Sequence, residues 1–155
     1  MNWRTALYLF NLLFGGILAG IELAVHYGFI VPSGLLTDRA QIRLRQSLIL
    51  RLRVLVPAFF VPSALSAAAL VSLDGSHPGF QFRCAGMVAV IVWIAVRGIT
   101  VRINSATLTW DAESPPEDWR ALVEHAERFH IAGVWAAVAA FASFLMAAAL
   151  SLAAQ

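Results

Sequence analysis

Two glutamate–histidine pairs interrupt apolar stretches that lie far apart in the sequence. Glu22 and His26 are four residues apart, and Glu127 and His130 are three residues apart. On a helix, either spacing places both side chains of a pair on one face. Two imidazoles and two carboxylates brought together from two helices could bind a transition metal such as iron or copper, or could transfer protons. We therefore treat these four residues as candidate metal ligands or proton-transfer groups.

Polar and aromatic side chains also recur at helical spacing in a third apolar stretch: Trp93, Arg97, Thr100 and Asn104. If this stretch is helical, the four side chains face the same way. Arg97 could then pair with Glu22 or Glu127, which would offset part of the cost of burying a charge in lipid. From the residues alone, two interpretations are possible: a structural charge network, or a metal or proton-transfer site. A haem between His26 and His130 is less favoured, because it gives neither glutamate a role.

The composition indicates that lipid surrounds most of this protein. The sequence has 155 residues, of which 60% are hydrophobic and 13% are charged. Soluble domains have about 45–50% apolar and about 25% charged residues. The net charge of +2 gives no indication of nucleic-acid binding, and the single cysteine excludes an internal disulfide framework. All the basic residues are arginines, which excludes chemistry that needs a protein lysine.

Four apolar segments are long enough to cross a bilayer, which needs about 20 residues. They cover residues 5–31, 52–73, 83–103 and 117–154. The sequence therefore predicts an all-α fold, a four-transmembrane-helix bundle that forms one integral membrane domain over residues 1–155. The polar segment 37–53 is predicted as an interfacial amphipathic turn before the second span. Ser114, followed by two prolines and Glu117, is predicted to begin the last helix.

The distribution of arginines predicts the orientation of the bundle. Five arginines fall in the first connection, and others flank the third, whereas the second connection has only Arg83. By the positive-inside rule, connections one and three are cytoplasmic and both termini are non-cytoplasmic. The last helix then extends into the cytoplasm, and the inner (plasma) membrane is the expected location. In this orientation the polar residues of three spans converge at one depth near the cytoplasmic face.

Several short motifs resemble the small four-helix membrane proteins grouped with the anthrone oxygenases, a family largely of unknown function. They occur in the expected order: Gly15-Gly16 with Gly20-Ile21-Glu22, then Arg102-Ile103-Asn104, then Trp119 and Glu127-Arg128-Phe129-His130. The resemblance implies oxidation of an activated aromatic carbon by molecular oxygen.

In the site that this resemblance implies, Glu22 or His26 acts as the general base and removes a proton next to a carbonyl group. Arg97 and Asn104 stabilise the resulting enolate. A metal held by His26, Glu127 and His130 could activate oxygen. The expected partners are the bilayer and a hydrophobic small molecule, with no nucleic acid. The sequence is also compatible with a homo-oligomer or a larger membrane complex. The alternatives are a non-enzymatic membrane subunit or scaffold whose buried charges are structural and, less favoured, a small transporter.

Overall fold

The computed structural model describes residues 2–73 and 78–154, and every regular element within these ranges is helical. Helix α1 (Trp3–Val25) continues through a π-helical turn (His26–Ile30) into α2 (Val31–Ser33). The other helices are α3 (Asp38–Val71), α4 (Phe80–Thr107) and α5 (Trp119–Ala153). The described ranges contain four helices that are long and apolar enough to cross a membrane. This confirms the predicted all-α architecture with four such helices.

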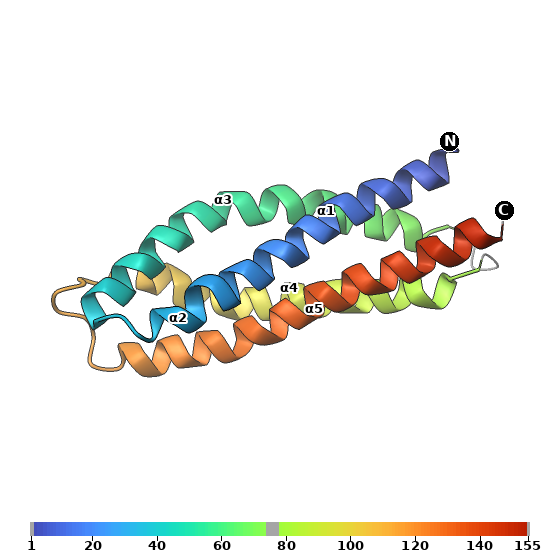
Figure 1. Ribbon diagram of the computed structural model, residues 1–155. Helices are drawn as coiled ribbons and strands as arrows, with labels where there is room; N and C mark the ends of the chain where they lie inside the picture. The colour runs from blue at the N-terminus through green and yellow to red at the C-terminus, as the bar shows by residue number, and fades with distance from the viewer. Residues whose placement is uncertain (1, 74–77, 155) are drawn as a thin grey trace.

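The four long helices lie side by side and alternate in direction (Figure 1). The first turn of α1 and the last turn of α5 lie at one end of the bundle. The α2–α3 and α4–α5 connections lie at the other, which we call the connection end. Helices α4 and α5 pack together most extensively, and α1 packs against both α3 and α5. Helix α3 arches outward in the middle of the bundle and contacts α5 through side chains, among them Ile42 against Trp119 and Val123.

Two predicted boundaries differ from the structure. The segment 37–53 is not a separate interfacial turn, because α3 begins at Asp38 and runs without interruption to Val71. Residues 38–53 contain no glycine or proline that would end a helix. Helix α5 begins at Trp119, and its N-cap is Asp118 rather than Ser114. A residue that precedes proline is disfavoured in the helical conformation, so the two prolines after Ser114 delay the start of α5.

The π-helical turn His26–Ile30 was not predicted, and it precedes Pro32. Proline lacks an N–H group, and its ring would clash with the carbonyl four residues earlier in a regular α-helix. The N–H of Val31 donates to the carbonyl of His26, five residues back. This wider turn lets the helix continue to Ser33, beyond residue 31, where the first predicted span ends. Single π-turns occur frequently at functional sites.

Three clusters of buried apolar side chains follow one another along the bundle. The cluster near the chain termini contains Phe144, the middle cluster contains Trp93, and the cluster at the connection end contains Ile42 and Trp119. In the middle cluster, Trp93 stacks on Phe60 with ring centroids 4.5 Å apart. The polar residues described below lie between the middle cluster and the cluster at the connection end.

We expect Gly79→Ala to destabilise the bundle and Gly20→Ala to be neutral or stabilising. Gly79 precedes α4 with φ of 86°, and a Cβ there would lie 3.0 Å from the backbone of Ala147. The left-handed conformation costs a non-glycine residue about 1–2 kcal/mol, and the contact with α5 adds to this. Gly20 has open space around it, and alanine is favoured over glycine within a helix. Unfolding midpoints of the two variants in the same detergent test this difference; equal midpoints would contradict it.

Candidate functional site

A cavity of about 470 Å³ lies among α1, α3, α4 and α5, between the middle cluster and the connection-end cluster. Sites for small molecules have volumes of about 300–1,000 Å³ and mostly apolar walls with a few polar groups. Most of this wall is also apolar, with Leu48, Ile49 and Leu52 contributed by α3. The polar and charged residues of the wall are Glu22, Arg45, Arg53, Arg97, Thr100, Asn104, Ser105, Glu127 and His130.

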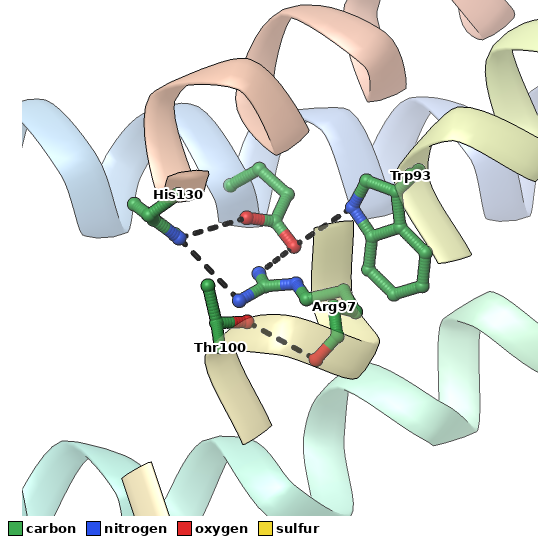
Figure 2. Close-up of polar contacts among 5 residues, drawn as sticks. Trp93, Arg97, Thr100 and His130 are labelled. Atoms are coloured by element: carbon green, nitrogen blue, oxygen red, sulfur yellow. Dashed lines mark hydrogen bonds and ion pairs between the residues drawn. The ribbon is translucent and has the colours of Figure 1, made fainter. Parts of the chain in front are cut away.

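Glu22 is the most deeply buried acid of the site, with 1% of its surface exposed. Its Oε1 atom forms an ion pair with Arg97 and accepts a hydrogen bond from the indole nitrogen of Trp93, 3.2 Å away (Figure 2). The guanidinium of Arg97 also lies over the ring of Trp93, 5.2 Å from the ring centroid. The Oε2 atom of Glu22 has no hydrogen-bond partner. Side chains of α4 therefore bind one carboxylate oxygen, and the other oxygen is buried without a hydrogen bond.

His130 faces the same cluster from α5. Its Nδ1 atom lies 3.4 Å from Nη1 of Arg97 and 3.8 Å from Oε2 of Glu22 (Figure 2). Arginine can only donate hydrogen bonds, so Nδ1 accepts from Arg97 and the second nitrogen carries the hydrogen. That second nitrogen is buried without a hydrogen-bond partner. The contacts therefore indicate a neutral imidazole whose lone pair points toward Arg97. The Oε2 atom of Glu22, which accepts no hydrogen bond, lies beside it.

His26 lies behind His130 rather than in the cavity wall. It is 6% exposed, and its ring centroid is 5.6 Å from that of His130. It is the first residue of the π-helical turn, one turn beyond Glu22. Among the residues predicted for the site, Glu22, Arg97, Asn104, Glu127 and His130 line the cavity, whereas His26 does not. The predicted roles of His26 as a general base or metal ligand stay predictions.

A second ion pair joins α3 to α5 across the cavity wall. Arg45 pairs with Glu127, and the side chains are 11% and 32% exposed. The sequence suggested Glu127 as a metal ligand or as a partner of Arg97, but α3 supplies its partner instead. Arg45 and Arg53 were interpreted only as part of a basic connection. Their eight-residue spacing, with Ile49 midway, was the available signal that they share one face of α3.

The geometry gives no support to the predicted metal site. No group of three or more histidine, cysteine, aspartate or glutamate side chains within residues 2–73 and 78–154 is arranged to hold a metal ion. Arg97, a cation, occupies the space next to Glu22 and His130, and Arg45 engages Glu127. The ring centroids of His26 and His130 are 5.6 Å apart, and the two rings are tilted by 41°. The metal site remains a prediction without support from this geometry.

The chemistry of the site has to be inferred from its geometry. No family model, curated protein or solved structure matches this chain. The resemblance to the anthrone oxygenases therefore stays a prediction. What the structure adds is a defined cluster of Glu22, Arg97 and His130, contributed by three helices and set in the wall of one cavity.

We expect Arg45 and Glu127 to be energetically coupled, because their ion pair is partly buried and joins α3 to α5. Arg45→Gln and Glu127→Gln should each lower the free energy of unfolding, since each leaves a partly buried charge without its partner. The double variant should lose less than the sum of the two, with a coupling energy of about 1–3 kcal/mol. Reversible unfolding in detergent measures the four free energies. Additive losses would show that the ion pair does not connect the helices.

Proposed function

We propose that the cavity is a membrane-embedded active site that binds a lipophilic small molecule and transfers a proton at its polar end. The observation that carries this proposal is the position of Arg97 between Glu22 and His130 in the cavity wall. Apolar lining suits the body of such a molecule, while the charged cluster suits a carbonyl or ionisable group. The helix packing alone would not require a cavity beside the buried charges.

In the proposed reaction His130 acts as the general base. When the carbonyl oxygen of the bound molecule accepts the hydrogen bond that Arg97 otherwise donates to Nδ1, the Nδ1 lone pair can accept a proton from the carbon next to that carbonyl group. The Oε2 atom of Glu22, 3.8 Å from Nδ1, stabilises the imidazolium that forms. Arg97 donates to the carbonyl oxygen as it becomes an enolate. Asn104 lies in the same wall and can donate a second hydrogen bond. The role first assigned to Glu22 or His26 thus moves to His130.

We further propose that dioxygen consumes the enolate, as the resemblance implies. The carbanion transfers electrons to dioxygen, and a carbon–oxygen bond forms to give a hydroperoxide. Loss of water, with removal of the second proton from the same carbon, leaves a new carbonyl group. One CH2 group and one O2 thereby become one C=O group and one water. The residues of this chain supply the proton transfers and the stabilisation of negative charge.

The proposed placement puts the connection end on the cytoplasmic side of the plasma membrane and both termini on the other side. Arginines gather at the connection end, as the positive-inside rule favours. Helix α3 has 34 residues, which corresponds to about 51 Å at 1.5 Å per residue, against about 30 Å of hydrocarbon. We assign this surplus length to the first turns of α3, at the level of the lipid headgroups. The cavity then lies where a lipophilic molecule can enter with its polar end toward the interface.

Loss of deuterium from anthrone labelled at its acidic methylene tests this function without oxygen. Under anaerobic conditions, the protein in phosphatidylcholine nanodiscs should accelerate the exchange by about 100-fold or more over empty nanodiscs, the usual range for general base catalysis. Admission of oxygen should then consume one O2 per anthrone. Exchange at the rate of empty nanodiscs would refute the proton-transfer function. Exchange without oxygen uptake would refute only the oxidation step.

A further inference from the structure

The cavity wall carries more positive than negative charge. Arg45, Arg53 and Arg97 line it, against Glu22 and Glu127. With His130 neutral, the wall has an excess of one positive charge. An uncompensated charge at the edge of a low-dielectric cavity attracts an opposite charge more strongly than it would in water.

The excess charge is on Arg53. Arg97 pairs with Glu22 and Arg45 pairs with Glu127, whereas no ion pair in the described part of the chain involves Arg53. Arg53 lies eight residues after Arg45, on the face of α3 that also supplies Ile49 to the cavity wall. Arg53 and its neighbour Arg51 are both exposed, but only Arg53 lines the cavity.

We infer that the ligand of this cavity is a lipophilic anion, and that Arg53 binds its charged group. The inference rests on the proposed function and adds the substrate class: one carboxylate or phosphate attached to a single chain or a ring system. A guanidinium binds either group through two parallel hydrogen bonds. Ile49 and Leu52, which precede Arg53 on α3, line the same cavity as the Glu22–Arg97–His130 cluster.

The volume of the cavity favours a small anion. About 470 Å³ lies within the range of sites for drug-sized molecules, and a phospholipid with two full acyl chains would not fit. An anionic lipid headgroup could still reach Arg53 from the bilayer. The charged group is the same in both cases, so the source of the anion has to be separated by experiment.

The test compares 1-pyrenebutyrate with its methyl ester, which differ only in charge and a methyl group. Binding to the protein in phosphatidylcholine nanodiscs is measured by energy transfer from tryptophan to pyrene, with empty nanodiscs subtracted. We expect the acid to bind at least about tenfold more tightly than the ester, as one charge-assisted contact provides. Arg53→Gln should remove this preference, and Arg51→Gln should keep it. Identical elution and thermal midpoints for the two variants exclude misfolding as the cause.

Equal binding of acid and ester, or a preference that survives Arg53→Gln, would overturn the inference. Nanodiscs containing phosphatidylglycerol identify the source of the anion. If that lipid weakens binding of the acid, an anionic headgroup competes for Arg53; if it has no effect, the site selects a free lipophilic anion. Binding is measured without any chemical step. A lost preference together with intact deuterium exchange on anthrone would therefore remove this inference and leave the proposed function in place.

Discussion

Glu22→Leu is expected to lower the free energy of unfolding by about 3–5 kcal/mol, the usual cost of removing one partner of a buried ion pair. Arg97 would remain in the cavity wall with only 20% of its side chain exposed and no carboxylate beside it. Replacing both residues, as Glu22→Leu with Arg97→Met, should recover most of the loss, because apolar side chains can replace a buried pair at little cost. Reversible unfolding in detergent measures all three variants.

The control for this series is Glu113→Gln. Glu113 pairs with Arg39 and Arg43, but the side chains of all three residues are at least half exposed. Exposed pairs contribute about 0–1 kcal/mol, so this variant should unfold close to the wild type. If Glu22→Leu were as mild as Glu113→Gln, the ion pair between Glu22 and Arg97 would not be buried as described.

His130→Asn is expected to lower the rate of deuterium exchange from anthrone by about 100-fold or more, since a positioned general base contributes about 10²–10⁴-fold. Asparagine retains a hydrogen-bonding side chain next to Arg97 but cannot accept the proton. His125→Asn is the matched control, because His125 is exposed on the same helix and contacts Phe129 outside the cavity. Exchange rates under anaerobic conditions, with the fold checked by thermal midpoint, provide the measurement.

An active His130→Asn variant would remove His130 from the mechanism. The Glu22→Leu, Arg97→Met variant then separates an active site from a purely structural network. If the charges only set the helix packing, this variant would regain stability and lose no exchange activity. We expect it to regain stability and remain inactive, because it lacks both the enolate donor and the carboxylate that stabilises protonated His130.

The convergence of Glu22, Arg97 and His130 could be predicted from local patterns. Each residue interrupts an apolar stretch, and each stretch is long enough to fix the depth of the residue in a bilayer. The stripe Trp93, Arg97, Thr100 and Asn104 faces the cavity as its spacing indicated. Depth and facing direction follow from the sequence because both depend on a regular helix.

The choice of ion-pair partners could not be predicted in the same way. It depends on how far each helix rotates about its axis and on how closely neighbouring helices pack. Glu127 pairs with Arg45 because α3 remains helical from Asp38 onward, whereas the sequence had indicated a polar turn there. His26 shares a helix face with Glu22, but it lies behind His130 rather than in the cavity wall. The lack of glycine and proline in residues 38–53 allows α3 to continue, but residue type and spacing do not determine the rotation and packing of the helices.

We propose that α1, α4 and α5 bring Glu22, Arg97 and His130 together inside the membrane. Solid-state NMR in lipid bilayers tests it directly, through the dipolar coupling between the side-chain carboxyl carbon of Glu22 and the guanidinium nitrogens of Arg97. Subtraction of the Glu22→Gln spectrum isolates this pair from the other arginine–glutamate pairs. We predict a coupling that corresponds to an ion pair, with nitrogen and oxygen within about 4 Å. No difference between the wild-type and Glu22→Gln spectra would contradict the site.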